Sequence, residues 1–302
     1  MIRPFLYGLA AALFFAVTFV LNRSMSLGGG SWMWSAALRF LFTLPLLLPV
    51  LIWTGELPSA WRHFRSAWKE YLLWGTVGFG FFYAPLVFAG DYGPGWLVAS
   101  SWQLTIICGS LLLPWLQPGA RIPWANLRWS LLVVFGVALM QWRQLKEFSS
   151  EHVLLCLAPV VLAAFMYPLG NRKMMSLCAG RVSTPARVFN MTLGSLPFWL
   201  FLSLQATIFS GPPPAGQMIQ ALAVALFAGV IATVLFFSAT NQVRHDFSKL
   251  AAIEATQALE VLFALGGEIF FLGAGLPDGW SLAGIALVTG GVMLNSLSAA
   301  RL

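Results

Sequence analysis

Long apolar segments recur along the whole chain and limit its possible folds more than any other feature. Each runs for about 18 residues or more, which allows an α-helix to cross the ~30 Å hydrocarbon core of a bilayer. Only 9% of the 302 residues are charged, against roughly 25% in a soluble domain. The sequence therefore predicts an all-α polytopic membrane protein.

Ten membrane-spanning helices can be drawn along the chain. Glycine- and proline-rich turns separate them, such as DYGPG at 91–95 and GPPPAG at 211–216,. The first span is expected to be a retained helix and not a cleaved signal peptide, because nine more spans follow it. We expect the spans near residues 4–26, 32–53, 70–90, 95–117, 126–143, 152–170, 184–209, 217–240, 250–273 and 279–299.

Basic residues are distributed unevenly between the two ends of these spans. With the N-terminus in the cytoplasm, thirteen lysines and arginines fall on the cytoplasmic side and three on the outer side. This bias follows the positive-inside rule. It predicts a multi-pass protein of the inner (plasma) membrane with both termini in the cytoplasm. The net charge of +7 then requires no nucleic-acid partner.

Short motifs recur in the same order about 150 positions apart, which predicts a five-helix repeat at 1–148 and a second at 149–302. Because five is odd, the second repeat would be inverted in the membrane relative to the first. Inverted repeats are typical of secondary transporters, whose substrate site lies near the midplane between the repeats. The matching motifs are Asn22-Arg23-Ser24-Met25 with Asn171-Arg172-Lys173-Met174, Arg39 with Arg187, Phe81-Phe82 with Phe236-Phe237, and Gln103 with Gln257.

The chain resembles a known family of transporters over essentially its whole length, and five stretches are the most distinctive. They are FFAVTFVLNRSM (14–25), SWMWSAALRFLF (31–42), FYAPLVFAGDYGPGWLVASSWQLTII (82–107), YPLGNRKMM (167–175) and KLAAIEATQALEVLFALGGEIFFLG (249–273). They are similar to the drug/metabolite transporter superfamily, in its ten-span EamA-like branch, and within it to the group named "Putative multidrug resistance efflux transporter". The resemblance implies an inner-membrane secondary carrier that exports small organic compounds. Small four-span members of the superfamily use a glutamate in their first helix; this chain has none there, so that proton site cannot be transferred.

The predicted ninth span carries three glutamates in otherwise apolar surroundings. Counted along a helix, Glu254 lies near the cytoplasmic end, Glu260 near the middle and Glu268 near the outer end,. A charge in the hydrocarbon core is costly unless it is paired. We therefore expect Arg39 to pair with Glu268, and Arg187 with Glu254, at similar depths. As an alternative, the two terminal glutamates reach the lipid headgroups.

Glu260 is expected to be the only carboxylate near the midplane, with no basic residue at its depth. Such a group should bind and release protons near neutral pH, which suits proton coupling or cation binding. The structural alternative is a permanently protonated side chain that is hydrogen-bonded to a neighbouring helix. Polar and aromatic residues expected at the same level are candidates for a substrate cavity, or, for the aromatic ones, for packing and interfacial belts: Gln257, Gln103, Trp102, Tyr83 and Tyr167.

The sequence favours a secondary active transporter that exports small organic compounds or metabolites by alternating access, with protons as a candidate coupling ion. Its partners would be the substrate and membrane lipids, and the chain would act as a monomer or a homodimer. A flippase for a lipid-linked or headgroup substrate would use the same fold and is the alternative. A membrane-embedded lipid-modifying enzyme is a remote alternative, because the three histidines lie in separate loops and no hydrolase or metalloprotease motif occurs,. No metal or cofactor is expected, because the three cysteines form no ligand spacing,.

Overall fold

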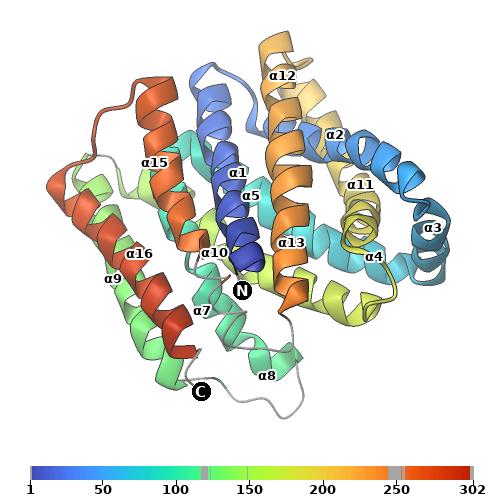
Figure 1. Ribbon diagram of the computed structural model, residues 1–302. Helices are drawn as coiled ribbons and strands as arrows, with labels where there is room; N and C mark the ends of the chain where they lie inside the picture. Colours follow the sequence, from blue (N-terminus) through green and yellow to red (C-terminus); the bar gives the residue numbers. More distant parts are fainter. Residues whose placement is uncertain are drawn as a thin grey trace.

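A computed structural model describes residues 2–116, 122, 124–147, 149–243, 253 and 256–299, and all regular structure within these residues is helical. The helices form one bundle (Figure 1). Their bounds are α1 Ile2–Leu27, α2 Trp32–Trp53, α3 Leu57–Ser66, α4 Trp68–Gly75, η1 Thr76–Gly80, α5 Phe81–Tyr92, α6 Gly95–Trp102, α7 Thr105–Leu111, α8 Leu113–Leu116, α9 Trp124–Glu147, α10 Ser150–Cys178, α11 Thr184–Ser210, α12 Ala215–Val224, η2 Ala225–Ala232, α13 Thr233–Gln242, η3 Thr256–Ala258, α15 Leu259–Leu272 and α16 Gly279–Ala299.

Six helical segments among the described residues are long and apolar enough to cross a membrane. They match the first, second, third, sixth, seventh and eighth predicted spans, so the prediction of a multi-pass helical protein is confirmed. The six segments are Ile2–Leu27, Trp32–Trp53, Trp68–Tyr92, Ser150–Cys178, Thr184–Ser210 and Ala215–Gln242.

The other four predicted spans are described only in part or are interrupted. α9 and α16 run for 24 and 21 residues, and their apolar stretches with described side chains are Arg128–Trp142 and Gly279–Leu294. The fourth predicted span is divided into α6, α7 and α8, and in the ninth the described residues from Thr256 onward form the 3-10 turn η3 and then α15. Ten spans therefore remain a prediction for these four segments.

Helix contacts between the two halves of the chain come in corresponding pairs. A helix of the first half packs against the second half as its equivalent in the second half packs against the first. α1 packs against α13 and η2, while α10 packs against α5 and η1. Likewise α1 packs against α15, and α10 against α6 and α7. Two further pairs join equivalent helices of the two halves, α2 with α11 and α9 with α16, and the second of these pairs lies at one edge of the bundle (Figure 1).

The third and eighth predicted spans each contain a π-helical segment, η1 between α4 and α5 and η2 between α12 and α13. π-helical turns are rare, and they often occur at functional sites. In η1, Gly78 lies directly against the backbone of Gly170 in α10. A side chain on either glycine would push the two helices apart, so this close packing requires glycine.

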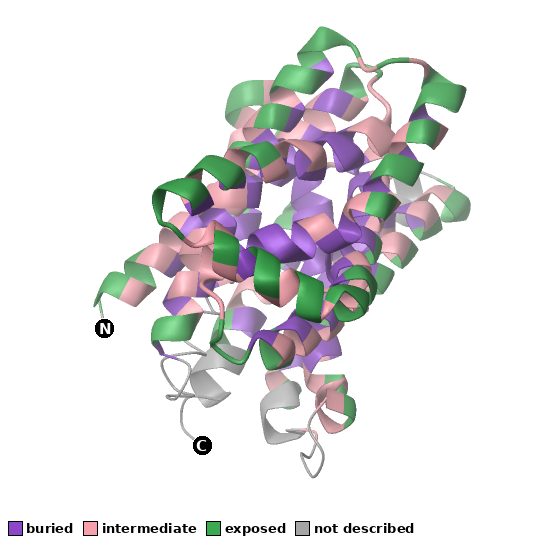
Figure 2. Cartoon of the chain, turned by 90° about the vertical axis from the view of Figure 1, so that its right-hand side faces the viewer, coloured by how far each residue is buried: buried purple, intermediate pink, exposed green. Residues whose placement is uncertain are grey.

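Buried residues gather in the middle of the bundle and exposed residues on its outside (Figure 2). The core contains many small residues together with large aromatic ones such as Tyr83 and Trp199. Many large apolar side chains on the outside are exposed, including Phe270 and Phe271 in α15. An exposed apolar exterior of this kind is the surface that lipid chains cover in a membrane protein.

A candidate site at two helix interruptions

Two interrupted helices meet inside the bundle. Between α6 and α7 the chain makes a tight turn in which the amides of Gln103 and Leu104 bond to carbonyls three residues earlier. The other interruption is η3, just before α15. The Gln103 side chain donates from Nε2 to the backbone carbonyl of Gln257 in η3, at 3.5 Å. The two glutamines matched in the sequence repeat therefore lie at adjacent helix breaks.

Glu260 lies in the first turn of α15, directly after the second interruption, and only 5% of its surface is exposed. The Gln103 side chain and the Arg39 guanidinium are polar neighbours within electrostatic range of its carboxyl group. The expectation that no basic residue lies at the depth of Glu260 is therefore wrong. Straight helices perpendicular to the membrane would separate the two residues in depth, whereas the ninth predicted span is interrupted beside Glu260.

Arg39 lies in α2 with its guanidinium over the ring of Tyr83, 4.1 Å from the ring centroid. The Tyr83 hydroxyl accepts a hydrogen bond from Asn22 Nδ2 at 3.1 Å. All three side chains are buried. Tyr83, a predicted cavity residue, thus joins α1, α2 and α5 through Asn22 and Arg39.

Glu268 does not pair with Arg39, which corrects the prediction of an ion pair between them. Its carboxylate accepts hydrogen bonds from the backbone amides of Gly95 at 2.7 Å and Trp96 at 3.5 Å, and Arg23 is the cation in electrostatic range. These amides are the first of α6, where backbone N–H groups lack partners within the helix and the helix dipole favours negative charge. The start of α6 therefore stabilises the buried carboxylate.

Arg187 in α11 is held in a setting like that of Arg39. Its guanidinium lies 4.3 Å from the centroid of the Phe237 ring, and Nη2 donates to Asn171 Oδ1 at 3.3 Å. Glu254, its predicted partner, lies outside the described residues. The pairing of Arg187 with Glu254 therefore stays a prediction.

Two of the predicted aromatic residues meet around Phe82. Its ring centroid is 4.9 Å from that of Trp102 and 4.8 Å from that of Tyr167. Gln257 lies at the interruption itself and donates to the carbonyl of Gly8 in α1 at 3.3 Å. Thus Gln103, Gln257, Glu260 and Arg39 gather at the breaks. Trp102 and Tyr167 pack against Phe82, whose ring centroid also lies 5.9 Å from that of Tyr83.

Sequence reasoning missed Asn22, Phe82 and Asn171 as neighbours of the site. All three belong to motifs that recur in the two halves, so the repeat was the signal that could have selected them. Asn22 begins the recurring Asn-Arg motif in the first helix of the first half, and Asn171 begins it in the first helix of the second half. Their hydrogen bonds to Tyr83 and Arg187 depend on helix packing, which the motifs alone do not specify.

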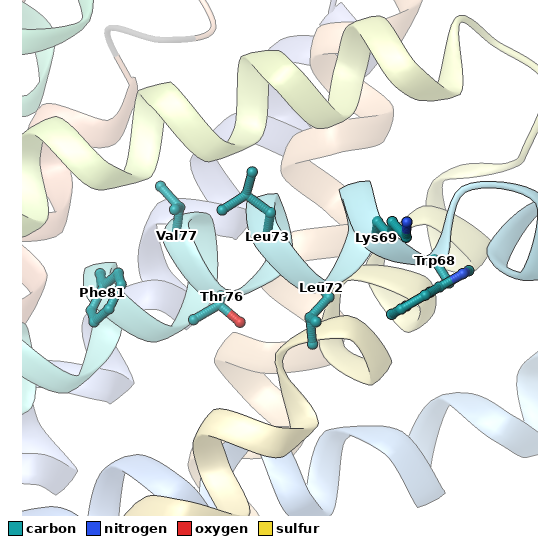
Figure 3. A pocket seen from close by; sticks show the side chains of 7 residues that line it. All are labelled: Trp68, Lys69, Leu72, Leu73, Thr76, Val77 and Phe81. Carbon is teal, nitrogen blue, oxygen red and sulfur yellow. The ribbon is translucent and has the colours of Figure 1, made fainter.

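A groove of about 380 Å³ lies on the outer surface of the third predicted span. Its side chains all come from consecutive turns of one helix (Figure 3): Trp68, Lys69, Leu72, Leu73, Thr76, Val77 and Phe81. It includes none of the predicted site residues. Since several of these side chains are exposed and apolar, this groove faces the surroundings of the bundle and is separate from the site at the helix interruptions.

The fold defines a multi-pass helical membrane protein with buried polar side chains at two helix interruptions. The chain belongs to the family described as "Putative multidrug resistance efflux transporter", whose model matches residues 2–301. This confirms the resemblance seen in the sequence. Membership of a transporter family also implies a small transported molecule and a protein that is not an enzyme.

Two relatives and one solved structure resemble the chain over most of its length. "Uncharacterized protein YjlA" of Bacillus subtilis (strain 168) is 45% identical over 98% of this chain and 95% of the relative. "Uncharacterized 42.1 kDa protein in intracellular alkaline protease 3'region" of Shouchella clausii is 42% identical, over 89% of this chain and 73% of its own. A protein crystal structure with 19% identity covers 99% of both chains with a TM-score of 0.66, a likeness that concerns the fold alone.

Proposed function

We propose that this protein is a secondary active transporter that exports small organic molecules by alternating access. The observation that carries the proposal is the hydrogen bond between the two helix interruptions, from Gln103 to the carbonyl of Gln257. In transporters, discontinuous helices at corresponding positions of two repeats surround the substrate, because their free backbone groups can bind it. Buried polar side chains next to such breaks are candidates for the substrate site.

The exchange of packing partners between the two halves supports an inverted repeat of five spans each. If α1 with α13 is equivalent to α10 with α5, the second half is related to the first by a two-fold axis. Rocking one half against the other would then open the central site to each side in turn. The pairs α2 with α11 and α9 with α16 would lie on that axis, because each joins equivalent helices.

Glu260 is the candidate for proton coupling within this site. It is buried, lies beside an interruption, and has both Gln103 and Arg39 in its surroundings. In an antiporter, one group holds either the proton or the substrate, and their competition couples the two fluxes. A carboxyl group that can exchange its proton only through a substrate site is suited to this role.

The proposed sidedness places both chain ends in the cytoplasm of a bacterial-type inner membrane. The unequal distribution of basic residues supports it,. Reporter fusions after residue 301 test it directly. A fusion that reports the outer side would exclude the ten-span arrangement and, with it, the inverted repeat.

Flux into liposomes that contain the purified protein tests the function. Compounds that raise the melting temperature of the protein would be assayed for transport driven by a proton gradient. We expect Glu260→Gln to fold and to lose this transport, because glutamine keeps the size of the side chain but cannot release a proton. Glu151→Gln, at an exposed position in α10, is the matched control and should transport like the parent.

Two outcomes would contradict the proposal. If Glu260→Gln transports like the parent across roughly pH 6 to 8, Glu260 does not couple protons to transport. If labelled lipids cross the liposome membrane with the protein while no soluble compound does, the protein is a lipid flippase. Comparison of both fluxes in one preparation separates these results.

A further inference from the structure

The groove on the outer surface of the third predicted span has a cation at one end and apolar side chains along the rest of its length. Lys69 is the only charged residue among the side chains that line it, and leucine, valine and phenylalanine side chains continue it along α4, η1 and the start of α5. Trp68 and Lys69 lie together at one end of this row and Phe81 at the other (Figure 3). The groove therefore changes from charged to apolar along the helix.

The lining side chains face away from the bundle, and the groove has the length of one membrane leaflet. The exposed fractions of Trp68, Leu73 and Phe81 are 52%, 55% and 45%. Phe81 follows Lys69 by twelve positions, which corresponds to about 18 Å along a helix. The hydrocarbon layer of one leaflet is ~15 Å thick, half of the ~30 Å core. The groove is therefore as long as a lipid chain is deep.

The charged end of the groove has the residue types that occur at the level of lipid headgroups. Lys69 Nζ lies 5.7 Å from the centroid of the Trp68 ring. Tryptophan is enriched at both membrane surfaces, and lysine side chains near helix ends extend toward the headgroups. This end of the groove is therefore expected at the depth of the lipid phosphates.

The preceding helix, α3, adds positive charge next to this end. One residue separates it from α4, and Arg62 and Arg65 are both exposed. Residues 57–81 contain three lysines and arginines, and Glu70 is their single acidic residue. Basic clusters beside a membrane-spanning helix attract lipids with anionic headgroups. The charges at this end therefore favour an anion.

Contacts with the rest of the protein hold α3 in place. The Phe64 ring stacks on that of Tyr71 in α4, with the centroids 5.4 Å apart. In α11, Asn190 Nδ2 donates a hydrogen bond to the carbonyl of Ala60 at 2.9 Å. A ten-residue helix is marginal without such packing. Because α3 is anchored in this way, its arginines lie at a fixed position next to the groove.

We propose that this groove binds a phospholipid with an anionic headgroup, whose phosphate lies at Lys69 and whose acyl chain runs along the groove to Phe81. A phospholipid fits because it joins an anion and an apolar chain in the same order as the groove. Under the proposed sidedness the lipid belongs to the cytoplasmic leaflet. The inference goes beyond the proposed function, because it does not depend on which molecule is transported.

A second copy of this chain fits the groove less well than a lipid does. In a two-fold dimer, the same surface of both copies meets itself. Two copies inserted in the same direction would then place Lys69 of one beside Lys69 of the other at the same depth. Like charges repel, whereas a lipid phosphate would neutralise the lysine.

Native mass spectrometry of the purified full-length protein tests the proposal with three probes. Phosphatidylglycerol and phosphatidylcholine with identical acyl chains differ in net headgroup charge, and sn-glycerol 3-phosphate has the phosphate without the chains. We expect phosphatidylglycerol to bind about fivefold or more tighter than phosphatidylcholine, because one basic residue at the membrane surface contributes about this factor. sn-Glycerol 3-phosphate should bind at least about a hundredfold more weakly, because it buries no acyl chain.

Variants assign the two parts of the lipid to the groove. Lys69→Gln should lower the preference for phosphatidylglycerol about fivefold. Arg128→Gln is the matched control: Arg128 is also an exposed cation beside a tryptophan ring, but its helix α9 lies at the edge of the bundle opposite α3 in the view of Figure 1. The double change Leu72→Ala with Leu73→Ala should weaken both lipids by a similar factor and keep the preference. Melting temperatures report whether each variant is folded.

Three results would overturn the inference. The first is equal binding of the two lipids by the parent, and the second is a preference that Lys69→Gln leaves unchanged. The third is a lipid-free dimer that separates into monomers in the Leu72→Ala, Leu73→Ala variant, which would make the groove an interface between copies. Transport into liposomes is measured separately, so each of these results would leave the proposed function standing.

Discussion

The two buried arginines, one in each half of the chain, differ in how their side chains are satisfied. Arg39 and Arg187 lie in the paired helices α2 and α11, and each places its guanidinium over an aromatic ring. In the second half the neighbouring asparagine bonds to the arginine. In the first half the asparagine bonds to the tyrosine hydroxyl instead. A single oxygen atom, present in Tyr83 and absent from Phe237, accompanies this difference.

The comparison indicates how a duplicated architecture can serve two purposes. The same helix pairs and the same types of residue recur in both halves, so the backbone arrangement is shared. What differs is the partner of the asparagine, which is the arginine in the second half and the tyrosine in the first. The Nε atoms of both arginines are buried without an acceptor among the described residues.

The most sensitive test of this comparison is to replace each arginine and to measure stability and transport separately. We expect Arg39→Gln to reduce flux at least tenfold with little change in melting temperature, because its guanidinium makes no hydrogen bond to any residue that the structure describes. Arg187→Gln should lower the free energy of unfolding by about 1.5–3 kcal/mol, the usual contribution of a charged hydrogen bond, and keep the flux per folded molecule. The reverse pattern would assign the ligand-binding role to the second half.

A second prediction concerns two glycines at helix crossings. A Cβ on Gly170 would fall on the backbone of Gly78 in η1, whereas a Cβ on Gly229 in η2 would meet only the Thr43 side chain. Overpacking costs about 1–3 kcal/mol when neighbours cannot move, so Gly170→Ala should lower the yield of folded protein more than Gly229→Ala. Size-exclusion profiles of the two variants measure this. Equal yields would mean that the crossing of α10 and η1 is not rigid.

The smallest expected effect comes from adding the missing hydroxyl to the second half. In Phe237→Tyr the new hydroxyl can engage Asn171 and draw it from Arg187. We expect a loss of about 1 kcal/mol in stability, the net value of one typical hydrogen bond, seen as a lower melting temperature. Phe236→Tyr is the control, because the Phe236 ring packs against Phe15. An unchanged melting temperature for Phe237→Tyr would show that the hydroxyl alone does not decide the arginine's partner.

Much of the fold could be predicted because the length of each apolar segment is read directly from the sequence. Six predicted spans and the family resemblance were confirmed in this way. The helix interruptions were not predicted, since the residues around Gln103 and Gln257 remain apolar through the break. The repeat did mark both glutamines, and the structure brings them together.

The charges of the site were predicted less well, and the reason is geometric. Straight helices place Arg39 at the depth of Glu268 and leave Glu260 without a cation. In the structure, Arg39 interacts with Glu260, and the start of α6 supplies the hydrogen bonds of Glu268. Tilted and interrupted helices shift side chains along the bundle, and free backbone amides can replace a cation. Neither effect is visible in residue spacing.

The π-helical segment η1 has a consequence for tolerated changes in chain length. A π-helical turn holds one residue more than an α-helical turn, so α5, which carries Tyr83, is rotated by about 100° relative to an uninterrupted helix. Deleting one residue between Thr76 and Gly80 would let the segment close into a regular α-helix at little cost to its backbone hydrogen bonds. The deletion would nevertheless turn Tyr83 away from Arg39. In this part of the chain, a single deleted codon is therefore expected to spare the helix and disable the site.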